Sequence, residues 1–232
     1  MRGGNAAARF TLSSVKRANP VREADRVSIP TSPASSLRRL SRRSLPVGAT
    51  KLARFLIGKT LVRELPRGRI IGRIVETEAY LPYDKACHAF NGLTKRNHSL
   101  FLPPGHAYVY FIYGNYFMLN VSAEKEGVGA AVLFRALEPL VGIEQMKRGR
   151  RHVADKDLAR GPGRLAAALR VTRSFDGLDF CAPGPLWLGT AVRPTGRIGK
   201  SVRIGINKDA HRLWRFYERG NPFVSGPKRL NA

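Results

Sequence analysis

The sequence predicts an α+β fold: a single mixed domain with a curved, mainly antiparallel β-sheet, flanking helices and a protruding β-hairpin. Runs of β-branched and aromatic residues follow one another closely and are separated by short turn-forming segments, a pattern typical of antiparallel strands. Helix start signals lie beside these runs. Once a basic N-terminal segment is set aside, about 180 residues remain, which is the usual size of one domain with its own core.

Residues 1–48 are expected to form a basic, disordered head, and residues 49–232 the folded domain. The first fifty residues hold ten basic and two acidic residues among many Ser, Pro and Ala, a composition that buries too little apolar surface to fold. A solvated tail that adds only non-specific affinity, a segment for organellar or nuclear targeting, and an over-long gene start all fit this composition.

The first elements of the domain are expected to be a short helix and a β-hairpin. Thr50 is a suitable N-cap for a helix KLARFLIG that Gly58 ends. Strands follow at 60–65 and 69–81, and the residues Pro, Arg and Gly at 66–68 have the composition of a hairpin loop.

Two carboxylates in the second strand are candidate functional groups. Glu76, Glu78 and Tyr80 fall at spacing two and therefore share one face of the strand. The Cα atoms of Glu76 and Glu78, at i and i+2, are roughly 6.6 Å apart, which suits paired acid and base roles in cleaving a glycosidic bond. The alternative is the polar outer face of an edge strand, although Glu is disfavoured in strands.

The aromatic stretch at 108–122 predicts a second hairpin. Gly114 and Asn115 tolerate the positive φ of a two-residue reversal, and Tyr113 and Tyr116 then flank its tip. Aromatic side chains point to both faces, so one face could line a pocket while the tip ring enters a base stack. The alternative is that cross-strand aromatic pairs only stabilise the hairpin.

The next elements are a buried strand and two helices. The strand at 131–137 carries Arg135, whose charge needs a partner, and Glu78 is a plausible one. Pro139 is expected to open a helix. A further helix at 160–170 has a proline in its first turn, and its start is either a phosphate site or an ordinary helix after a glycine turn. Short strands are expected at 185–189 and 201–206.

The charge predicts a polyanionic partner. Lys and Arg number 41 against 16 acidic residues, which gives a net charge of +25. Nucleic acid is preferred over a membrane surface, since no lipidation signal or apolar run long enough to cross a bilayer is present. Cys87 and Cys181 lack the spacing of metal ligands, so we expect reduced thiols and no metal.

Several motifs together resemble the methylpurine DNA glycosylase family. They are GRIVETEAYL, His88, TKRN, PGHAYVYFIYGNYFMLN, VLFRALEPL, RGPGRL, SFDG, WRFY and GNPFVS, and they extend from about residue 50 to 226. The resemblance implies an enzyme without cofactor or metal that flips an alkylated or deaminated purine out of duplex DNA and hydrolyses its N-glycosidic bond, leaving an abasic site. It also implies a monomer, located in the cytoplasm with the nucleoid if bacterial.

The same resemblance implies roles for individual residues. Glu78 is similar to the family's water-activating base, and Arg135 to the residue that holds Glu78 and the water. Asn120 is similar to the residue that excludes the exocyclic amine of guanine, and Tyr113 to the ring that fills the vacated stack. Tyr80, His88 and Tyr110 would surround the flipped base, where electron-rich rings favour a cationic purine. Phosphate-contact candidates are Arg96, Arg160, Gly163 and Arg164.

One conflict and two alternatives accompany this interpretation. A strict two-residue hairpin places Asn120 on the face opposite Tyr110, so a bulge or strong twist is needed to bring both into one pocket. A non-catalytic basic nucleic-acid-binding protein would explain the charge alone. An O-glycoside hydrolase that uses Glu76 with Glu78 would explain the carboxylates but neither the charge nor the tip tyrosine.

Overall fold

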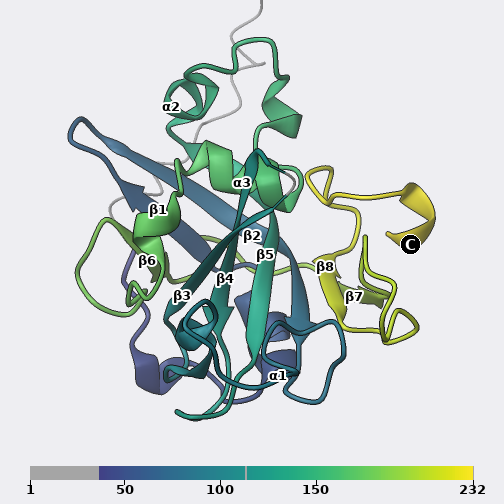
Figure 1. Cartoon of the computed structure of the whole chain (residues 1–232). Helices are drawn as coiled ribbons and strands as arrows, with labels where there is room; N and C mark the ends of the chain where they lie inside the picture. The colour runs from purple at the N-terminus through teal and green to yellow at the C-terminus, as the bar shows by residue number, and fades with distance from the viewer. Residues whose placement is uncertain (1–36, 113, 232) are drawn as a thin grey trace, which may run out of the picture. The chain divides into compact units, whose positions relative to one another are not determined.

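The computed structural model describes residues 37–112 and 114–231, and in this part of the chain the α+β prediction is confirmed (Figure 1). The strands form one sheet in the order β3-β4-β5-β2-β1-β6, with β8 pairing both β2 and β7, and every pairing is antiparallel. The strands are β1 (Thr60–Glu64), β2 (Arg69–Tyr80), β3 (Ala107–Ile112), β4 (Tyr116–Ser122), β5 (Ala131–Val141), β6 (Leu186–Gly189), β7 (Ile198–Ser201) and β8 (Arg215–Glu218). The α-helices are α1 (Ala49–Leu56), α2 (Ile143–Lys147) and α3 (Pro162–Ala168). No helix in the described residues is long and apolar enough to span a bilayer.

Strand β2 lies at the centre of the sheet and not at its edge. It pairs with β5 on one side, and on the other side with β1 over its first half and with β8 over Glu76–Glu78. Register shifts interrupt the β5 pairing on both sides of Glu76, and such bulges re-aim side chains. Every residue from Ile70 to Ala79 is buried. The alternative of a polar outer face for Glu76 and Glu78 is therefore wrong.

The β3–β4 hairpin has a different register from the one predicted. Ile112 pairs with Tyr116 and Tyr108 with Asn120, so three residues connect the strands and the two-residue reversal is wrong. Gly114 has a φ of +72°, which only glycine adopts readily. Because one residue of register changes which face a side chain occupies, Asn120 now shares a face with Tyr108 and Tyr110. No bulge is needed to bring them together.

Helix α1 begins one residue before the predicted N-cap Thr50. Gly48, with a φ of +111°, is the N-cap residue. The Ala49 N–H donates to Glu124 Oε1 at 3.2 Å. An acidic side chain from the segment after β4 therefore caps the helix, a role that was expected of the Thr50 hydroxyl. Helix α1 packs on β2 and β5 through its buried side chains Ala49, Leu52, Ala53 and Leu56.

Two predicted elements near the sheet are wrong. Pro139 lies inside β5 and does not open a helix; it pairs with Gly72 beside a register shift, a position where proline is tolerated in a sheet. The helix α2 begins only after Gly142, which is left-handed. The strand predicted at 201–206 ends at Ser201, where β7 stops. The residues after Ser201 leave the sheet and contact β2 through Arg203 and Ile204.

The folded part includes residues that the sequence analysis placed in the head. Leu40 and Leu45 belong to the main hydrophobic core. Arg42 Nη2 lies 2.6 Å from Asp179 Oδ2, and Arg39 bridges to Gly189 at the end of β6. The boundary after residue 48 is therefore at least twelve residues too late. The earlier part of the head, residues 1–36, lies outside the described residues.

Candidate active site

Glu78 is fully buried and held from three directions. Its Oε1 accepts the backbone N–H of Ile204 at 2.8 Å and lies 3.3 Å from Arg135 Nη1. Its Oε2 accepts the Tyr80 hydroxyl at 2.9 Å. The predicted pairing of Arg135 with Glu78 is thus confirmed, and the carboxylate is fixed by donors from β5, from β2 and from the segment after β7.

Glu76, on the same face, has a different environment. Its Oε1 accepts hydrogen bonds from Nε of Arg135 at 2.9 Å and from Nε of Arg215 at 2.6 Å. Its Oε2 accepts a hydrogen bond from the Ser225 N–H at 2.7 Å. Burial favours the protonated acid, but the two guanidinium groups and the Ser225 N–H outweigh it and lower the pKa of Glu76. Glu76 is therefore a structural counter-ion for two buried arginines.

Tyr80 connects Glu78 with a pocket. Burial, and then the adjacent Glu78 carboxylate, raise the pKa of the Tyr80 phenol well above its ordinary value. The phenol therefore keeps its proton at neutral pH and donates a hydrogen bond to Glu78. The Tyr80 ring lines the pocket, whereas the Glu78 carboxylate lies behind it.

The pocket brings together all four residues predicted to surround a base: Tyr80, His88, Tyr110 and Asn120. Tyr108, Ala86, Cys87, Leu100 and Ala131 complete its lining. The rings of His88 and Tyr110 are in contact, with centroids 4.5 Å apart. The cavity measures only about 20 Å³, room for about one water molecule. The pocket in this conformation is therefore too small for a purine ring.

Hydrogen bonds fix two of the pocket side chains. His88 Nδ1 is 2.8 Å from the Tyr108 hydroxyl. Burial, and secondarily Arg96, lower the pKa of His88, so the ring is neutral at pH 7. Asn120 Nδ2 donates to the carbonyl oxygens of Tyr108 at 3.1 Å and Met118 at 3.4 Å, which sets the orientation of its amide.

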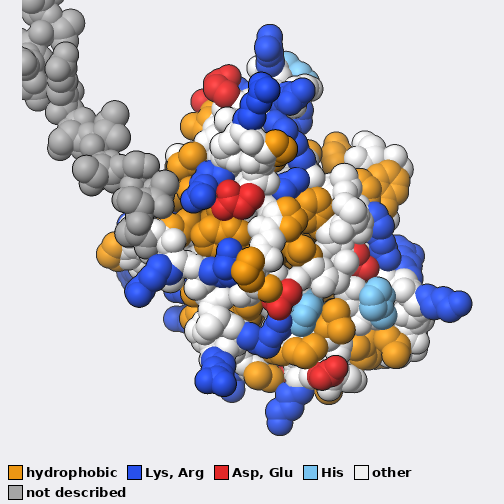
Figure 2. Space-filling model, turned by 90° about the vertical axis from the view of Figure 1, so that its left-hand side faces the viewer, with side chains coloured by type: hydrophobic (Ala, Val, Ile, Leu, Met, Phe, Trp, Pro, Cys, Tyr) orange, Lys and Arg blue, Asp and Glu red, His pale blue; other side chains and the backbone are white. Residues whose placement is uncertain are grey.

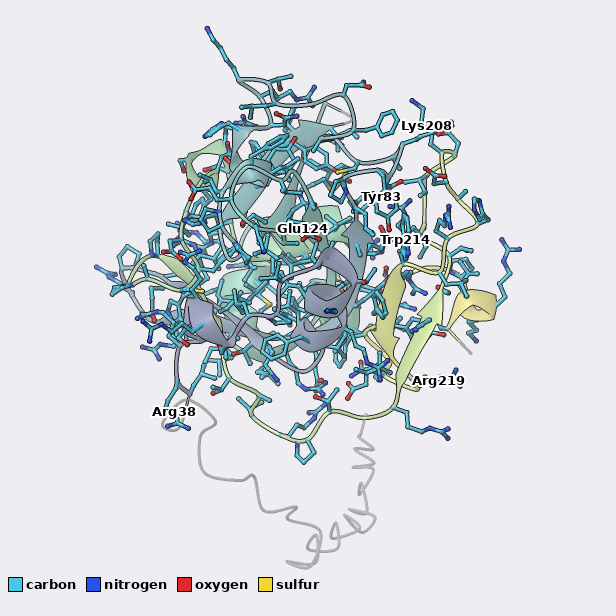
Figure 3. The ribbon with its side chains drawn as sticks, turned by 90° about the horizontal axis from the view of Figure 1, so that it is seen from below. Arg38, Tyr83, Glu124, Lys208, Trp214 and Arg219 are labelled. Carbon is cyan, nitrogen blue, oxygen red and sulfur yellow. The ribbon has the colours of Figure 1, made fainter. Side chains whose placement is uncertain are left out.

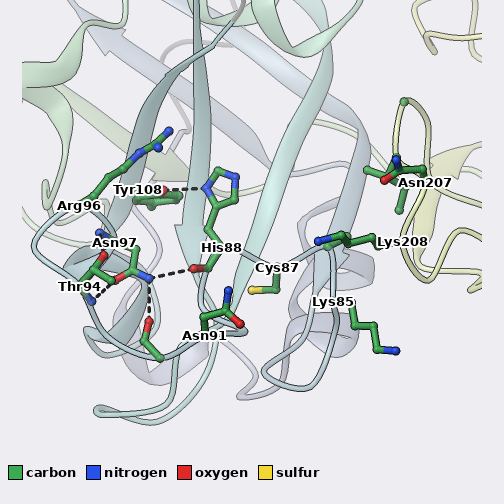
Figure 4. Close-up of a pocket in the computed structure, with 14 residues that line it drawn as sticks. Lys85, Cys87, His88, Asn91, Thr94, Arg96, Asn97, Tyr108, Asn207 and Lys208 are labelled. Atoms are coloured by element: carbon green, nitrogen blue, oxygen red, sulfur yellow. Dashed lines mark hydrogen bonds between the residues drawn. The ribbon is translucent and has the colours of Figure 1, made fainter.

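A larger cleft of about 500 Å³ adjoins the pocket and shares Ala86, Cys87, His88 and Tyr108 with it (Figure 4). Lys85, Arg96 and Lys208 give it a basic rim. Its remaining lining residues are Asn91, Gly92, Thr94, Asn97, Gly205, Ile206 and Asn207. A basic cleft of this kind is suited to binding the phosphate groups of a nucleic acid.

Several residues at the site were not assigned a role from the sequence. Asn97 donates to the carbonyl oxygens of His88 at 2.9 Å and Gly92 at 3.0 Å and so holds the loop that carries His88; its place in the TKRN motif was the only signal. Arg215 is one of the many basic residues of the C-terminal part of the sequence, and it is fully buried against Glu76. Arg203 and Ile204 were interpreted as part of a strand.

The phosphate-contact candidates differ in their availability. Arg96 is exposed at the cleft. Arg164 is 55% exposed, although its Nη1 lies 3.5 Å from Asp157. Arg160 donates from Nε to the Val224 carbonyl oxygen at 2.9 Å and also faces Asp157, so its side chain is already engaged.

Gly163 serves close packing between α3 and the hairpin. A Cβ at this position would lie 2.7 Å from the Tyr116 ring. Helix α3 has only seven residues, with Pro162 in its first turn as predicted. Tyr113, the residue expected to enter the base stack, lies outside the described residues, between Ile112 and Gly114.

Comparison with known proteins identifies the family to which the chain belongs. The sequence model of the methylpurine-DNA glycosylase family matches residues 44–222. A protein of Mesorhizobium japonicum named "Putative 3-methyladenine DNA glycosylase" is 61% identical over 191 residues, covering 82% of this chain and 92% of its own. Proteins of the same name from Paraburkholderia phytofirmans and Methanocella arvoryzae are 51% and 50% identical; they cover 82% and 75% of this chain, and 90% of their own length in each case. The chain therefore belongs to the methylpurine-DNA glycosylase family.

Proposed function

We propose that this DNA glycosylase flips an alkylated or deaminated purine out of duplex DNA into the pocket of Tyr80, His88, Tyr110 and Asn120, and hydrolyses its N-glycosidic bond with a water that Glu78 activates. The observation that carries the proposal is the position of Glu78, a buried carboxylate held by fixed donors directly behind a pocket wall. Such preorganisation is what a general base requires.

The proposed step needs one carboxylate only. The water oxygen forms a bond to the sugar C1′ as the bond between C1′ and the purine nitrogen breaks, and the bonding electron pair leaves with the base. Glu78 accepts the proton of the water as positive charge develops on the sugar. Arg135 holds Glu78 in place, since its Nη1 lies 3.3 Å from Glu78 Oε1.

The lining of the pocket supports selection among purines. Tyr80 and Tyr110 offer electron-rich ring faces that attract a cationic alkylated purine. A neutral His88 adds no repulsive charge. Asn120 would exclude guanine by meeting its exocyclic amine, a role that requires the fixed amide orientation that its two hydrogen bonds to the backbone provide.

The surface supports an extended DNA contact. Lys and Arg side chains gather over the upper part of the face shown in Figure 2, with some acidic side chains among them. A second cleft, of about 1190 Å³, lies between the β1–β2 turn and α2, and its basic lining residues are Arg67, Lys147, Arg148, Arg151 and Arg170. Phosphate neutralisation by such groups supplies affinity without sequence preference. Tyr113 at the hairpin connection would fill the gap left by the flipped nucleotide.

The environment of Glu76 argues against the O-glycoside hydrolase alternative. A second catalytic acid must give and take a proton, but both Glu76 oxygens accept hydrogen bonds from Arg135, Arg215 and Ser225, and its lowered pKa keeps it charged. A paired-carboxylate mechanism therefore lacks its acid.

A base-release assay tests the proposal against a non-catalytic binding protein. Duplexes that each carry one 3-methyladenine, 7-methylguanine, hypoxanthine or ethenoadenine are incubated with excess protein, and free base and abasic sites are measured. We expect release from at least one lesion duplex and none from the undamaged control. Tight duplex binding without release of any of the four bases would refute the proposed function and support the binding protein.

A further inference from the structure

Arg203 is a fully buried residue in contact with a wall of the proposed base pocket. Its guanidinium carbon lies 4.5 Å from the ring centroid of Tyr80 and 5.0 Å from that of Trp214. Trp214 in turn meets Tyr83 edge to face at 6.1 Å (Figure 3). Tyr80 lines the pocket but Arg203 does not, so the guanidinium supports the ring from outside the pocket.

Arg203 also connects this ring to the loop that leads to His88. Its Nη2 donates to Asp84 Oδ1 at 2.9 Å, and Nη1 donates to Asp84 Oδ2 and, at 3.0 Å, to the Ala79 carbonyl oxygen. Asp84 Oδ1 accepts the Ala86 N–H at 3.0 Å, and the Asp84 carbonyl oxygen accepts the Cys87 N–H at 2.9 Å. Asp84 therefore shapes the turn immediately before His88.

The third connection leads to the proposed base. The residue after Arg203 is Ile204, whose backbone N–H donates to Glu78 Oε1 at 2.8 Å. Since a side chain with two hydrogen bonds to Asp84 and contacts with two aromatic rings has little freedom, it also fixes the adjacent peptide group. One buried ion pair thus fixes the position of the Tyr80 ring, the conformation of the turn before His88 and the position of the Ile204 N–H that donates to Glu78.

We propose that Arg203 and Asp84 are positioning residues for base excision. They hold the pocket walls and the Glu78 carboxylate at fixed positions relative to each other. The inference rests on the proposed function of Glu78 and of the pocket. Neither residue touches the reacting atoms, so their contribution is geometric, and small displacements of reacting groups are costly in rate.

A second buried pair in the same sheet provides a matched control. Arg73 is fully buried, like Arg203, and its guanidinium binds both oxygens of Glu218, with Nη2 at 2.6 Å from Oε1. Within the part of the chain that the structure describes, the Nε of Arg73, like that of Arg203, has no hydrogen-bond partner. This pair makes no contact with the pocket lining or with Glu78 among the interactions of the described residues.

The test compares neutral double variants of the two pairs, Arg203→Met with Asp84→Asn and Arg73→Met with Glu218→Gln. Single-turnover rates at saturating enzyme are measured for duplexes with hypoxanthine, a neutral base, and with 7-methylguanine, a cationic one. The neutral base departs less readily and depends more on aligned groups. We expect the ratio of the two rates, hypoxanthine over 7-methylguanine, to fall at least about tenfold in the Arg203 pair and to change less than about twofold in the control.

A change in this ratio separates positioning from stability, because loss of folded protein lowers both rates equally. Arg203→Lys keeps a cation beside Asp84 but lacks the planar group that contacts the Tyr80 and Trp214 rings. It should lower the ratio at least about threefold, and it decides the test alone if the double variant does not fold. An unchanged ratio in the Arg203 variants, or an equal change in the control, would overturn the inference. Failure of the unmodified protein to release any of the four lesion bases would instead overturn the proposed function.

Discussion

Replacing Glu78 with glutamine removes the proposed base while leaving its contacts almost intact. The amide oxygen can still accept from Ile204 and Arg135, and the amide nitrogen can turn its protons towards the Tyr80 hydroxyl oxygen, at the positions where these groups now lie 2.8, 3.3 and 2.9 Å from the carboxylate. An amide cannot take a proton from water. We expect the single-turnover rate on a hypoxanthine duplex to fall about 10²- to 10⁴-fold.

Glu76→Gln is the control. For this variant the structure predicts a large loss of stability and a small loss of excision rate, the opposite of Glu78→Gln. Arg135 keeps Glu78 as a partner, but Arg215 loses the only carboxylate that it binds among the described residues. Leaving such a charge buried costs about 3–5 kcal/mol, or a fall in Tm of at least about 6 °C for a domain of this size. In Glu78→Gln, Arg135 stays paired with Glu76, so we expect about half that fall or less.

The two variants are compared by thermal unfolding and by single-turnover excision, with the rate normalised to the fraction of folded protein. Glu78→Gln should lose more activity, and Glu76→Gln more stability. If Glu76→Gln abolishes excision per folded molecule while Glu78→Gln keeps a near-normal rate, the proposed base is wrong, and Glu76 takes its place.

Four further predictions follow from the site and the fold. Tyr113→Ala should weaken binding of lesion-containing duplex roughly 5- to 150-fold, the worth of one stacked ring, with little change in Tm; the reverse result would make Tyr113 a packing residue. Affinity for undamaged duplex should fall steeply between low and physiological salt, and a flat titration would contradict phosphate binding. Deleting residues 1–36 should leave Tm and excision unchanged, whereas deleting residues 1–48 should lower Tm because Leu40 and Leu45 are lost from the core. Burial alone would raise the pKa of Glu218, but hydrogen bonds, above all from Arg73, lower it to about 2; its stabilisation is therefore present above pH about 4.5 and lost as pH falls towards 2, and the Tm difference from Glu218→Gln should shrink over that window.

The sequence predicted the elements of the sheet better than their pairing. Strands β1 and β2 end within one residue of their expected limits, because Pro and Gly mark their turn clearly. The face shared by Glu76, Glu78 and Tyr80 followed from strand geometry alone. The register of β3 and β4 did not follow, since Gly114 and Asn115 suit connections of two or three residues equally. Only the pairing of Tyr108 with Asn120 resolves this.

The parts of the site that escaped prediction come from tertiary contacts without a local signal. Pro139 was expected to start a helix because proline favours first turns, but its place beside a register shift in β5 is decided by pairing with β2. Arg203 and Arg215 look like the many surface arginines of a chain with 41 basic residues. Their burial depends on partners more than a hundred residues away, Asp84 and Glu76.

The pairing of β2 with β8 has a consequence for how the protein is made. A ribosome releases Glu76 and Glu78 long before it releases Ile204 and Arg215, so the strand with the proposed base waits for more than a hundred further residues before these two of its donors exist. Contacts of such long sequence separation form slowly. A chain cut short before β7 would therefore lack the Ile204 and Arg215 donors and leave Arg135 as the only cationic partner of Glu76 and Glu78 among the described residues, and a bond-breaking activity would arise only in chains completed almost to their end.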